Sequence, residues 1–314
     1  MKKQNSIDIP ADVPSHAAQE YLHNYQAITK PSNRLFLFAA DQKIEHLNED
    51  FYGPDIHPDV HHVDHLHVDH LFEIAQQGKI GAFATHLGLI ARYGKQYPSI
   101  NYIVKLNAKT NLIPAKQRDP ISQELWSVND VVNMKEQSDL NIRGIGFSIY
   151  LGSEFEHEML AQAAEAIFNA HQHGLITILW AYLRGKSIED DQDPFLIAGA
   201  AGVATSLGAD FVKIKPPHAT KALSNTDALK LACDAAGNTK VICSGQAKDE
   251  PHHFLQTVYD QLKAGTSGCA IGRNIFQRSE PEAIAMTEAL SALVHDNASV
   301  ERALEFYRKA LSIK

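Results

Sequence analysis

One lysine stands out, by its surroundings, as a residue that could carry out carbonyl chemistry. Lys213 lies in the segment GADFVKIK (residues 208–215), whose apolar residues predict a strand buried in the fold. Burial disfavours the charged ammonium and lowers the pKa of a lysine. A neutral amine in a dry pocket is a nucleophile that can form a Schiff base with a carbonyl substrate. The alternative is that Lys213 only extends its ammonium to solvent at the mouth of the fold.

A second lysine shares this strand. Lys215 follows Lys213 by two positions, so an ideal strand places both side chains on one face. Alternation alone therefore leaves either lysine as the Schiff-base former. A nearby cation, from Lys105 or Lys215, would lower the pKa of Lys213 further by like-charge repulsion.

Other polar side chains follow the predicted strands at the ends where a barrel builds its active site. Cleavage of a carbon–carbon bond through an imine needs a group that takes the proton of the departing hydroxyl. Tyr150 or Asp41 could supply it. No nucleophile elbow, Walker loop or dinucleotide fingerprint is present. The strand-end set is Asp41, Thr85, Lys105, Asn107, Tyr150, Tyr182, Arg184, Lys213, Lys215, Ser244 and Arg273.

The last two predicted strands indicate a phosphate site. Ser244-Gly245 ends one strand, and Gly272-Arg273 ends the other. The loops after strands seven and eight of a barrel often hold phosphate with backbone N–H groups and a helix N-terminus. Arg273 would add a charge-assisted hydrogen bond.

Short, continuously apolar runs alternate with amphipathic stretches, which predicts a parallel sheet covered by helices. Eight strand–helix units favour an α/β fold of the (β/α)8 TIM-barrel type, with a doubly wound open sheet as the alternative. Gly174, Gly208 and Gly265 fit the C-terminal ends of helices. The predicted strands are 34–40, 79–85, 101–106, 143–150, 176–182, 210–215, 240–244 and 267–272, and the clear helices are 155–173, 195–207, 227–236 and 252–264.

Three further helices flank the predicted barrel, which spans roughly residues 34–278. One precedes it, at 17–28. Two follow it, at 280–294 and 299–312, where they could close the base of the barrel or carry a subunit interface. No linker or repeat divides the chain, so we expect residues 1–314 to form a single domain.

Composition narrows the class of protein. The net charge of -8 disfavours general binding to nucleic acid or to an anionic membrane. The polar N-terminal residues predict neither a signal peptide nor a membrane span, and we expect a cytoplasmic protein. Cys233, Cys243 and Cys269 have no paired spacing and are expected to be reduced thiols.

A histidine-rich insertion at roughly 54–70 carries six histidines interleaved with Asp59, Asp64 and Asp69. Such a set of side chains could bind zinc. The spacing matches no known metal motif, so we favour a solvated loop and predict no metal site. The histidines are His57, His61, His62, His65, His67 and His70.

From Arg34 to Gln277 the chain resembles the archaeal-type class I fructose-bisphosphate aldolases, in the wider group that includes deoxyribose-phosphate aldolase. Five ordered motifs carry the resemblance. They are DxxxEH (41–46), IYLGS (149–153), WAYLRG (180–185), GADFVK (208–213) and AIGRNIFQ (270–277).

The resemblance implies roles for named residues. Lys213, rather than Lys215, would form the Schiff base, Tyr150 would donate and accept the proton, and Asp41 would assist at the substrate hydroxyls. It also implies a homo-oligomer and no cofactor. The predicted phosphate- and substrate-binding residues are Ser244, Gly245, Gly272, Arg273, Lys105 and Arg184.

Three segments depart from the pattern of the family. Gln42-Lys43 replaces His-Gly after Asp41, Gln246 replaces the second glycine of Ser-Gly-Gly, and Pro216-Pro217-His218 replaces Tyr-Thr-Gly-Asp. All three are expected near the substrate.

We therefore predict an aldolase that acts on a phosphorylated ketose, with fructose 1,6-bisphosphate cleaved to dihydroxyacetone phosphate and glyceraldehyde 3-phosphate as the first candidate. The alternatives are a related aldol or acyl transfer on another sugar phosphate, a metal-dependent lyase that uses the histidine-rich insertion, and a non-catalytic sugar-phosphate-binding barrel.

Overall fold

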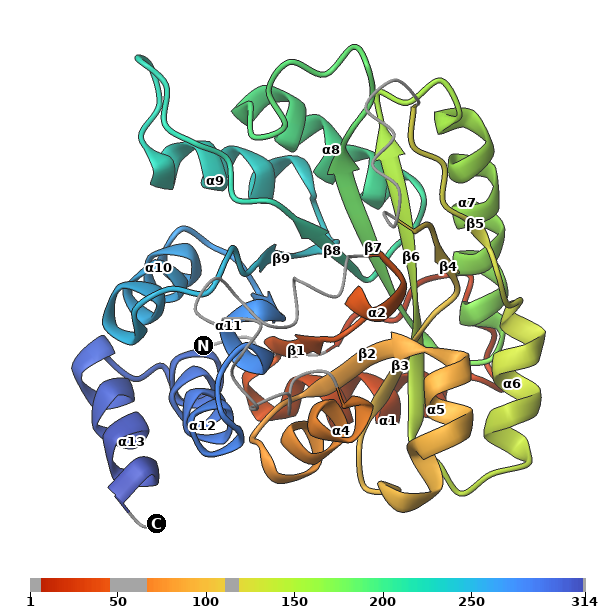
Figure 1. Cartoon of the computed structure of the whole chain (residues 1–314). Helices are drawn as coiled ribbons and strands as arrows, with labels where there is room; N and C mark the ends of the chain where they lie inside the picture. The colour runs from red at the N-terminus through yellow and green to blue at the C-terminus, as the bar shows by residue number, and fades with distance from the viewer. Residues whose placement is uncertain (1–6, 46–66, 111–118, 313–314) are drawn as a thin grey trace, which may run out of the picture.

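Eight parallel strands close into a barrel with helices around it, as the prediction of a (β/α)8 barrel requires (Figure 1). The closed strand order excludes the open-sheet alternative. The computed structural model describes residues 7–45, 67–110 and 119–312. Around the barrel the order is β1 (Leu35–Ala39), β10 (Gly268–Ile271), β9 (Lys240–Ser244), β8 (Phe211–Ile214), β7 (Ile176–Leu183), β6 (Ile142–Leu151), β3 (Tyr102–Lys105) and β2 (Ala82–His86).

Every strand of the barrel overlaps a predicted strand, and each of the seven predicted helices is present. Three short helices on the first half of the barrel, α4 (Val68–Gln77), α5 (Leu87–Tyr93) and α6 (Val128–Glu136), were not predicted. Neither was the small antiparallel pair of β4 (Asn107–Ala108) and β5 (Gln123–Glu124). The remaining elements are α1 (Ala18–Thr29), η1 (Lys30–Ser32), α2 (Gln42–Glu45), η3 (Gly94–Gln96), α7 (Glu156–Gln172), α8 (Pro194–Ser206), α9 (Asn225–Ala235), α10 (Pro251–Lys263), α11 (Arg273–Phe276), α12 (Glu280–Asp296) and α13 (Val300–Ser312).

Strand alternation divides the apolar residues into an inner and an outer set. On β1, Phe36 and Phe38 pack outward in the larger cluster, whereas Leu35 and Leu37 belong to the cluster inside the barrel. Trp180 is part of the inner cluster and is fully buried. Gly146 on the neighbouring strand makes room for it, because a Cβ there would lie 2.5 Å from the indole ring. The inner face thus holds a large aromatic ring below the site described next.

Helix α1 closes the base of the barrel. Tyr21 and Tyr25 join the inner cluster, and the ring of Tyr25 stacks on Phe211 with centroids 5.7 Å apart. The two helices that follow the barrel do not close its base, which is one of the two places predicted for them. Helix α12 packs on the outside of the barrel against β1 and α4, and α13 packs on α12 and α10.

Glycines terminate helices where the sequence predicts it. Gly174 and Gly208 follow α7 and α8 and have φ of 66° and 86°, in the left-handed region that favours glycine. A Cβ on Gly174 would also lie 2.7 Å from the carbonyl oxygen of Ala17, so α1 could not approach so closely. The glycine therefore contributes to the seal at the base.

A buried polar network joins the base to the barrel. The Tyr21 hydroxyl donates to Asp210 Oδ1 over 2.5 Å, and Asp210 Oδ2 lies 3.2 Å from His171 Nε2. His171 Nδ1 lies 2.8 Å from Asp12 on the segment before α1. Burial alone would lower the pKa of His171, but the hydrogen bonds and charges of Asp210 and Asp12 outweigh it and raise that pKa to about 9.

This network predicts a loss of stability in mild alkali. Because the folded-state pKa of His171 is raised, its contribution is complete below about pH 6.5 and disappears as the pH rises through 9. We expect the free energy of unfolding, measured with urea, to fall by up to about 3 kcal/mol over this range. The variant His171→Asn should lose this pH dependence, and His173→Asn, on an exposed residue two positions away, should keep it. An unchanged profile in His171→Asn would contradict the assignment.

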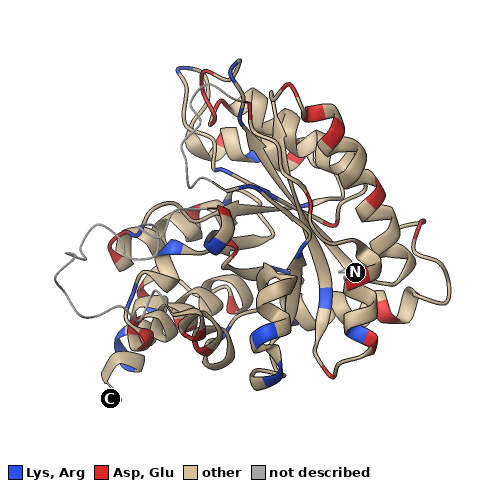
Figure 2. Ribbon diagram, turned by 45° about the vertical axis from the view of Figure 1, so that its right-hand side comes forward, with Lys and Arg blue, Asp and Glu red and all other residues tan. Residues whose placement is uncertain are grey.

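Charged residues of both signs are interspersed over the outer helices, and several basic positions lie on the strands at the centre (Figure 2). In this view neither sign gathers on one side of the molecule. Among the described helices, none is both long enough and apolar enough to span a membrane.

Candidate active site

A cavity of about 90 Å³ opens at the C-terminal ends of the barrel strands. It brings together seven of the nine predicted site residues from both halves of the sequence. Tyr150 and Lys105 are not among the residues that line it. The lining residues are Asp41, Glu45, Tyr182, Arg184, Lys213, Lys215, Ser244, Gly245, Ala270, Gly272 and Arg273.

Lys213 points from β8 into this cavity and is only 6% exposed. Its Nζ lies 5.3 Å from the centroid of the Trp180 ring and 6.0 Å from that of Tyr182. Burial lowers the pKa of Lys213, the carboxylates of Asp41 and Glu45 oppose that shift, and Arg273 adds to it. The net effect is a lowered pKa, which favours the neutral, nucleophilic amine.

Lys215 also lines the cavity, but its setting differs from that of Lys213. It is half-buried, and its ammonium forms an ion pair with Asp191. An amine engaged by a carboxylate is less available to attack a carbonyl carbon. The environments of the two lysines therefore favour Lys213 as the Schiff-base former.

Lys105 is completely buried beneath the cavity. Its Nζ lies 3.3 Å from Asp41 Oδ2 and 3.1 Å from Glu45 Oε1, and donates to Ser148 Oγ over 2.6 Å. Burial alone would lower the pKa of Lys105, but the charges of Glu45 and Asp41 outweigh it and raise that pKa. Lys105 is thus a fixed cation that orients the two carboxylates.

This arrangement differs from the expectation that Lys105 or Lys215 would lower the pKa of Lys213. Both lysines are paired with carboxylates, and the cation that lowers the pKa of Lys213 is Arg273. Lys105 stays a predicted substrate-binding residue that acts, in this geometry, through Asp41 and Glu45.

Two tyrosines occupy equivalent positions on neighbouring strands, because Tyr150 on β6 pairs with Tyr182 on β7. Tyr182 lines the cavity with Lys213, whereas Tyr150 is 1% exposed. Arg184 lies over both rings, with its guanidinium carbon 5.5 Å from the Tyr150 centroid and 5.6 Å from that of Tyr182. Burial and the nearby carboxylates raise the pKa of both phenols, so both are protonated at neutral pH.

The predicted phosphate residues converge on one wall of the cavity. Ser244 and Gly245 end β9, while Gly272 and Arg273 lead from β10 into α11. The N–H of Gly245 already donates to the carbonyl oxygen of Ala270 over 3.1 Å, which fixes the loop. Arg273 gives this wall a positive charge that suits an anion.

Sequence reasoning missed the roles of Tyr182, Glu45 and Ser148. A signal for Glu45 was present, since it follows Asp41 by four positions, the spacing that brings two side chains together at the start of a helix, and α2 begins directly after Asp41. Tyr182 lies two positions after Trp180, so its side chain points to the same inner face of the barrel. Tyr150 points inward as well, so strand alternation does not show which tyrosine is catalytic. For Ser148 the sequence indicates only that its side chain points into the barrel.

Most of the histidine-rich insertion lies outside the described residues, including His57, His61, His62 and His65. His70 is buried on α4, and its Nε2 lies 3.3 Å from the carbonyl oxygen of Phe276. Among the residues that the structure describes, no three histidine, cysteine or acidic side chains are grouped as metal ligands.

A parallel barrel that buries an amine of lowered pKa next to a phenol and two carboxylates defines an enzyme of lysine-dependent carbonyl chemistry. The chain belongs to the DeoC/LacD family of aldolases, whose family model matches residues 35–278. It is therefore an aldehyde-lyase of the Schiff-base class, and the resemblance inferred from its motifs is confirmed.

Three known proteins show how close the similarity is. A relative from Methanocaldococcus jannaschii, named fructose-bisphosphate aldolase/6-deoxy-5-ketofructose 1-phosphate synthase, is 48% identical over 97% of this chain and 96% of its own. The solved fructose-bisphosphate aldolase from Slackia heliotrinireducens is 45% identical, with a TM-score of 0.92 over 97% of this chain and 94% of its own. An archaeal fructose-1,6-bisphosphate aldolase, solved with its catalytic lysine bound to the carbinolamine intermediate, is 28% identical, with a TM-score of 0.70 over 87% and 99% of the two chains.

Proposed function

We propose that this protein cleaves and forms a phosphorylated ketose through an imine at Lys213, with fructose 1,6-bisphosphate as the first candidate substrate. The observation that carries the proposal is the buried Lys213 of lowered pKa, in one cavity with Tyr182, Asp41 and Arg273. The products would be dihydroxyacetone phosphate and glyceraldehyde 3-phosphate.

The chemistry begins when the neutral Lys213 amine attacks the ketose carbonyl carbon. The resulting carbinolamine loses water to give a protonated imine. This cation accepts the electron pair of the neighbouring carbon–carbon bond as that bond breaks, while the departing hydroxyl gives up its proton. The enamine left on Lys213 is then protonated on carbon and hydrolysed.

Proton transfer is proposed for Tyr182 rather than for Tyr150. Tyr182 lines the cavity, and its raised pKa keeps the phenol protonated, ready to donate when the carbinolamine loses water or when a bond forms. In cleavage the same oxygen accepts the proton of the substrate hydroxyl. Tyr150 lies next to it under Arg184 and would position that guanidinium. Asp41 assists at the substrate hydroxyls, held in place by Lys105.

Substrate recognition is assigned to two cations that follow different strands, Arg184 after β7 and Arg273 after β10. Arg273, with Ser244, Gly245 and Gly272, would bind one phosphate, and Arg184 would bind the other end of the substrate.

A second candidate is the aldol or acyl transfer that forms another sugar phosphate. It is favoured by the name of the relative from Methanocaldococcus jannaschii. That name gives the relative two activities, a fructose-bisphosphate aldolase and a synthase of a second sugar phosphate.

Reductive trapping tests the imine directly. Incubation with fructose 1,6-bisphosphate or dihydroxyacetone phosphate and borohydride, with and without EDTA, should give a stable adduct on the peptide that contains Lys213. Peptide mass spectrometry identifies the modified lysine. Turnover that EDTA abolishes, without an adduct, would overturn the proposal in favour of the metal-dependent alternative.

Arg273→Ala is expected to raise the KM for the phosphorylated ketose roughly 10- to 100-fold, because a charge-assisted hydrogen bond is lost. Unphosphorylated fructose provides the internal control, since its turnover should change little. The acid limb of the pH–rate profile should also move to higher pH, because Arg273 no longer lowers the pKa of Lys213. Equal losses for both substrates would contradict a role in phosphate binding.

A further inference from the structure

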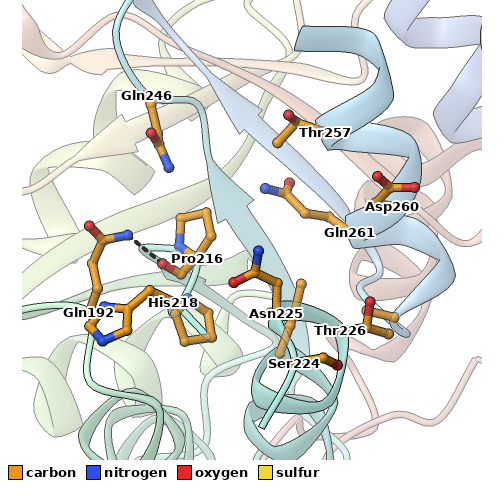
Figure 3. A pocket seen from close by; sticks show the side chains of 13 residues that line it. Gln192, Pro216, His218, Ser224, Asn225, Thr226, Gln246, Thr257, Asp260 and Gln261 are labelled. Carbon is orange, nitrogen blue, oxygen red and sulfur yellow. Dashed lines mark hydrogen bonds between the residues drawn. The ribbon is translucent and has the colours of Figure 1, made fainter. Parts of the chain in front are cut away.

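A second cavity lies on the other side of the loops that follow β8 and β9. It has a volume of about 570 Å³ and is bounded by these loops and by the facing parts of α9 and α10 (Figure 3). This volume lies in the range of small-molecule sites. Pro216, Pro217 and His218 enter it from the first loop and Gln246 from the second, so two of the three departures from the family pattern meet here.

The second cavity shares no lining residue with the catalytic cavity. The two cavities are nevertheless lined by consecutive residues of the chain. Lys215 and Gly245 line the catalytic cavity, and the residues that follow them, Pro216 and Gln246, line the second cavity. Gln192 fixes the first loop by donating from Nε2 to the carbonyl oxygen of Pro216 over 2.7 Å. The departures at Pro216–His218 and Gln246, expected near the substrate, therefore line a cavity beside the catalytic one. A smaller cavity of about 200 Å³ shares Gln246 and Gln261 with the former and Ser244 and Gly245 with the latter.

One side chain in this cavity is set for a ligand. Gln261 on α10 is 8% exposed, and within the described part of the chain its carboxamide makes no hydrogen bond. Figure 3 shows the carboxamide pointing into the cavity, between Gln246 and Asn225. Because the carboxamide faces the open cavity, a ligand hydroxyl can reach both its N–H donor and its C=O acceptor.

The lining defines the chemistry of that ligand. Among the described residues the lining contains no Lys or Arg, and its cationic candidate, His218, lies 3.2 Å from Asp190, so these residues do not favour an anion. It contains no Phe, Tyr or Trp on which a nucleobase would stack. Carboxamides and hydroxyls alternate with the apolar surface of Pro216 and Pro217, which suits the OH and CH faces of a sugar.

We propose that this cavity is a second binding site for an uncharged polyhydroxyl compound, a sugar or a polyol, recognised by Gln261, Gln246 and Asn225. Binding there would be independent of imine chemistry, because no group of the catalytic cavity takes part. A bound ligand would hold the loops whose other sides carry Lys215 and Gly245.

The test uses D-sorbitol as the probe, since it has many hydroxyls but no carbonyl and so forms no imine. Saturation-transfer NMR should show sorbitol bound to the wild-type protein and to Lys213→Ala, and inorganic phosphate should not displace it. Gln261→Leu should weaken the binding by roughly fivefold or more, as expected for a lost hydrogen bond. Gln19→Leu, an exposed amide on α1, is the matched control and should bind normally.

Gln246→Ala on the exposed loop provides a second variant if Gln261→Leu does not fold. The proposal is overturned if sorbitol receives no saturation, if phosphate displaces it, or if both lining variants bind as well as Gln19→Leu. The borohydride adduct on Lys213 is measured separately, so a failure of this site leaves the test of the aldolase chemistry intact.

Discussion

Lys213→Ala is expected to lower kcat/KM by at least about 10⁴-fold and to abolish the borohydride adduct, because the proposed nucleophile of the covalent intermediate is removed. The fold should survive, since alanine removes a buried amine and leaves a small cavity beside Trp180. Steady-state cleavage of fructose 1,6-bisphosphate and peptide mass spectrometry provide the two measurements. Substantial activity with normal trapping in this variant would exclude Lys213 as the nucleophile.

Lys215→Ala is the matched control, two positions away on the same face. Its ammonium is paired with Asp191, so its removal should leave the adduct on Lys213 in place. An adduct that disappears in Lys215→Ala and persists in Lys213→Ala would reverse the assignment.

The pH dependence follows from the same environment. Burial and Arg273 lower the pKa of Lys213, so the neutral amine persists to lower pH than in an exposed lysine. The rate of adduct formation should decline only as the pH falls through this lowered pKa.

The second large effect is expected at Tyr182. Tyr182→Phe should lower kcat by about 10²- to 10⁴-fold, the usual contribution of a positioned acid–base group. Trapping with dihydroxyacetone phosphate should persist, although more slowly, since water can replace Tyr182 as the proton donor when the carbinolamine is dehydrated, whereas cleavage needs a base held at the substrate hydroxyl. A purely structural role of Tyr182 would instead lower kcat and the yield of the trapped adduct together.

Tyr150→Phe provides the comparison, because it removes the same hydroxyl from the equivalent position of the neighbouring strand. We expect less than about a tenfold loss in kcat, as Tyr150 does not line the cavity. A larger loss in Tyr150→Phe than in Tyr182→Phe would return the proton-transfer role to Tyr150, as the sequence resemblance implied.

The strands of this fold could be predicted because each is a continuous apolar run buried on both faces. Helices α5 and α6 were harder, since α5 has seven residues and α6 is largely polar. For α6 a signal existed in the capping box of Ser127 and Asp130, in which each side chain accepts from the other's backbone N–H.

The candidate site could be predicted where the information is local and not where it depends on packing between strands. Lys213, Ser244 and Arg273 follow from their position at strand ends. The choice between Tyr150 and Tyr182 does not follow from position, because the two residues pair with each other on neighbouring strands and both point inward. They differ in that Tyr182 lines the cavity and Tyr150 does not. The pairing of Lys105 with Glu45 joins residues 60 positions apart, and only the closed barrel reveals it.

The indole of Trp180 lies within 4.7 Å of the Lys105 ammonium and 5.3 Å of Lys213 Nζ. Indole emission responds to charges close to the ring, and the charge at Nζ changes when the protonated imine forms and again when cleavage leaves the neutral enamine. The only other tryptophan, Trp126, lies beside His86 with ring centroids 5.9 Å apart. A Trp126→Phe protein would thus carry a single tryptophan, beside its nucleophile, and with excitation selective for indole its emission would follow the covalent intermediate in real time without any label.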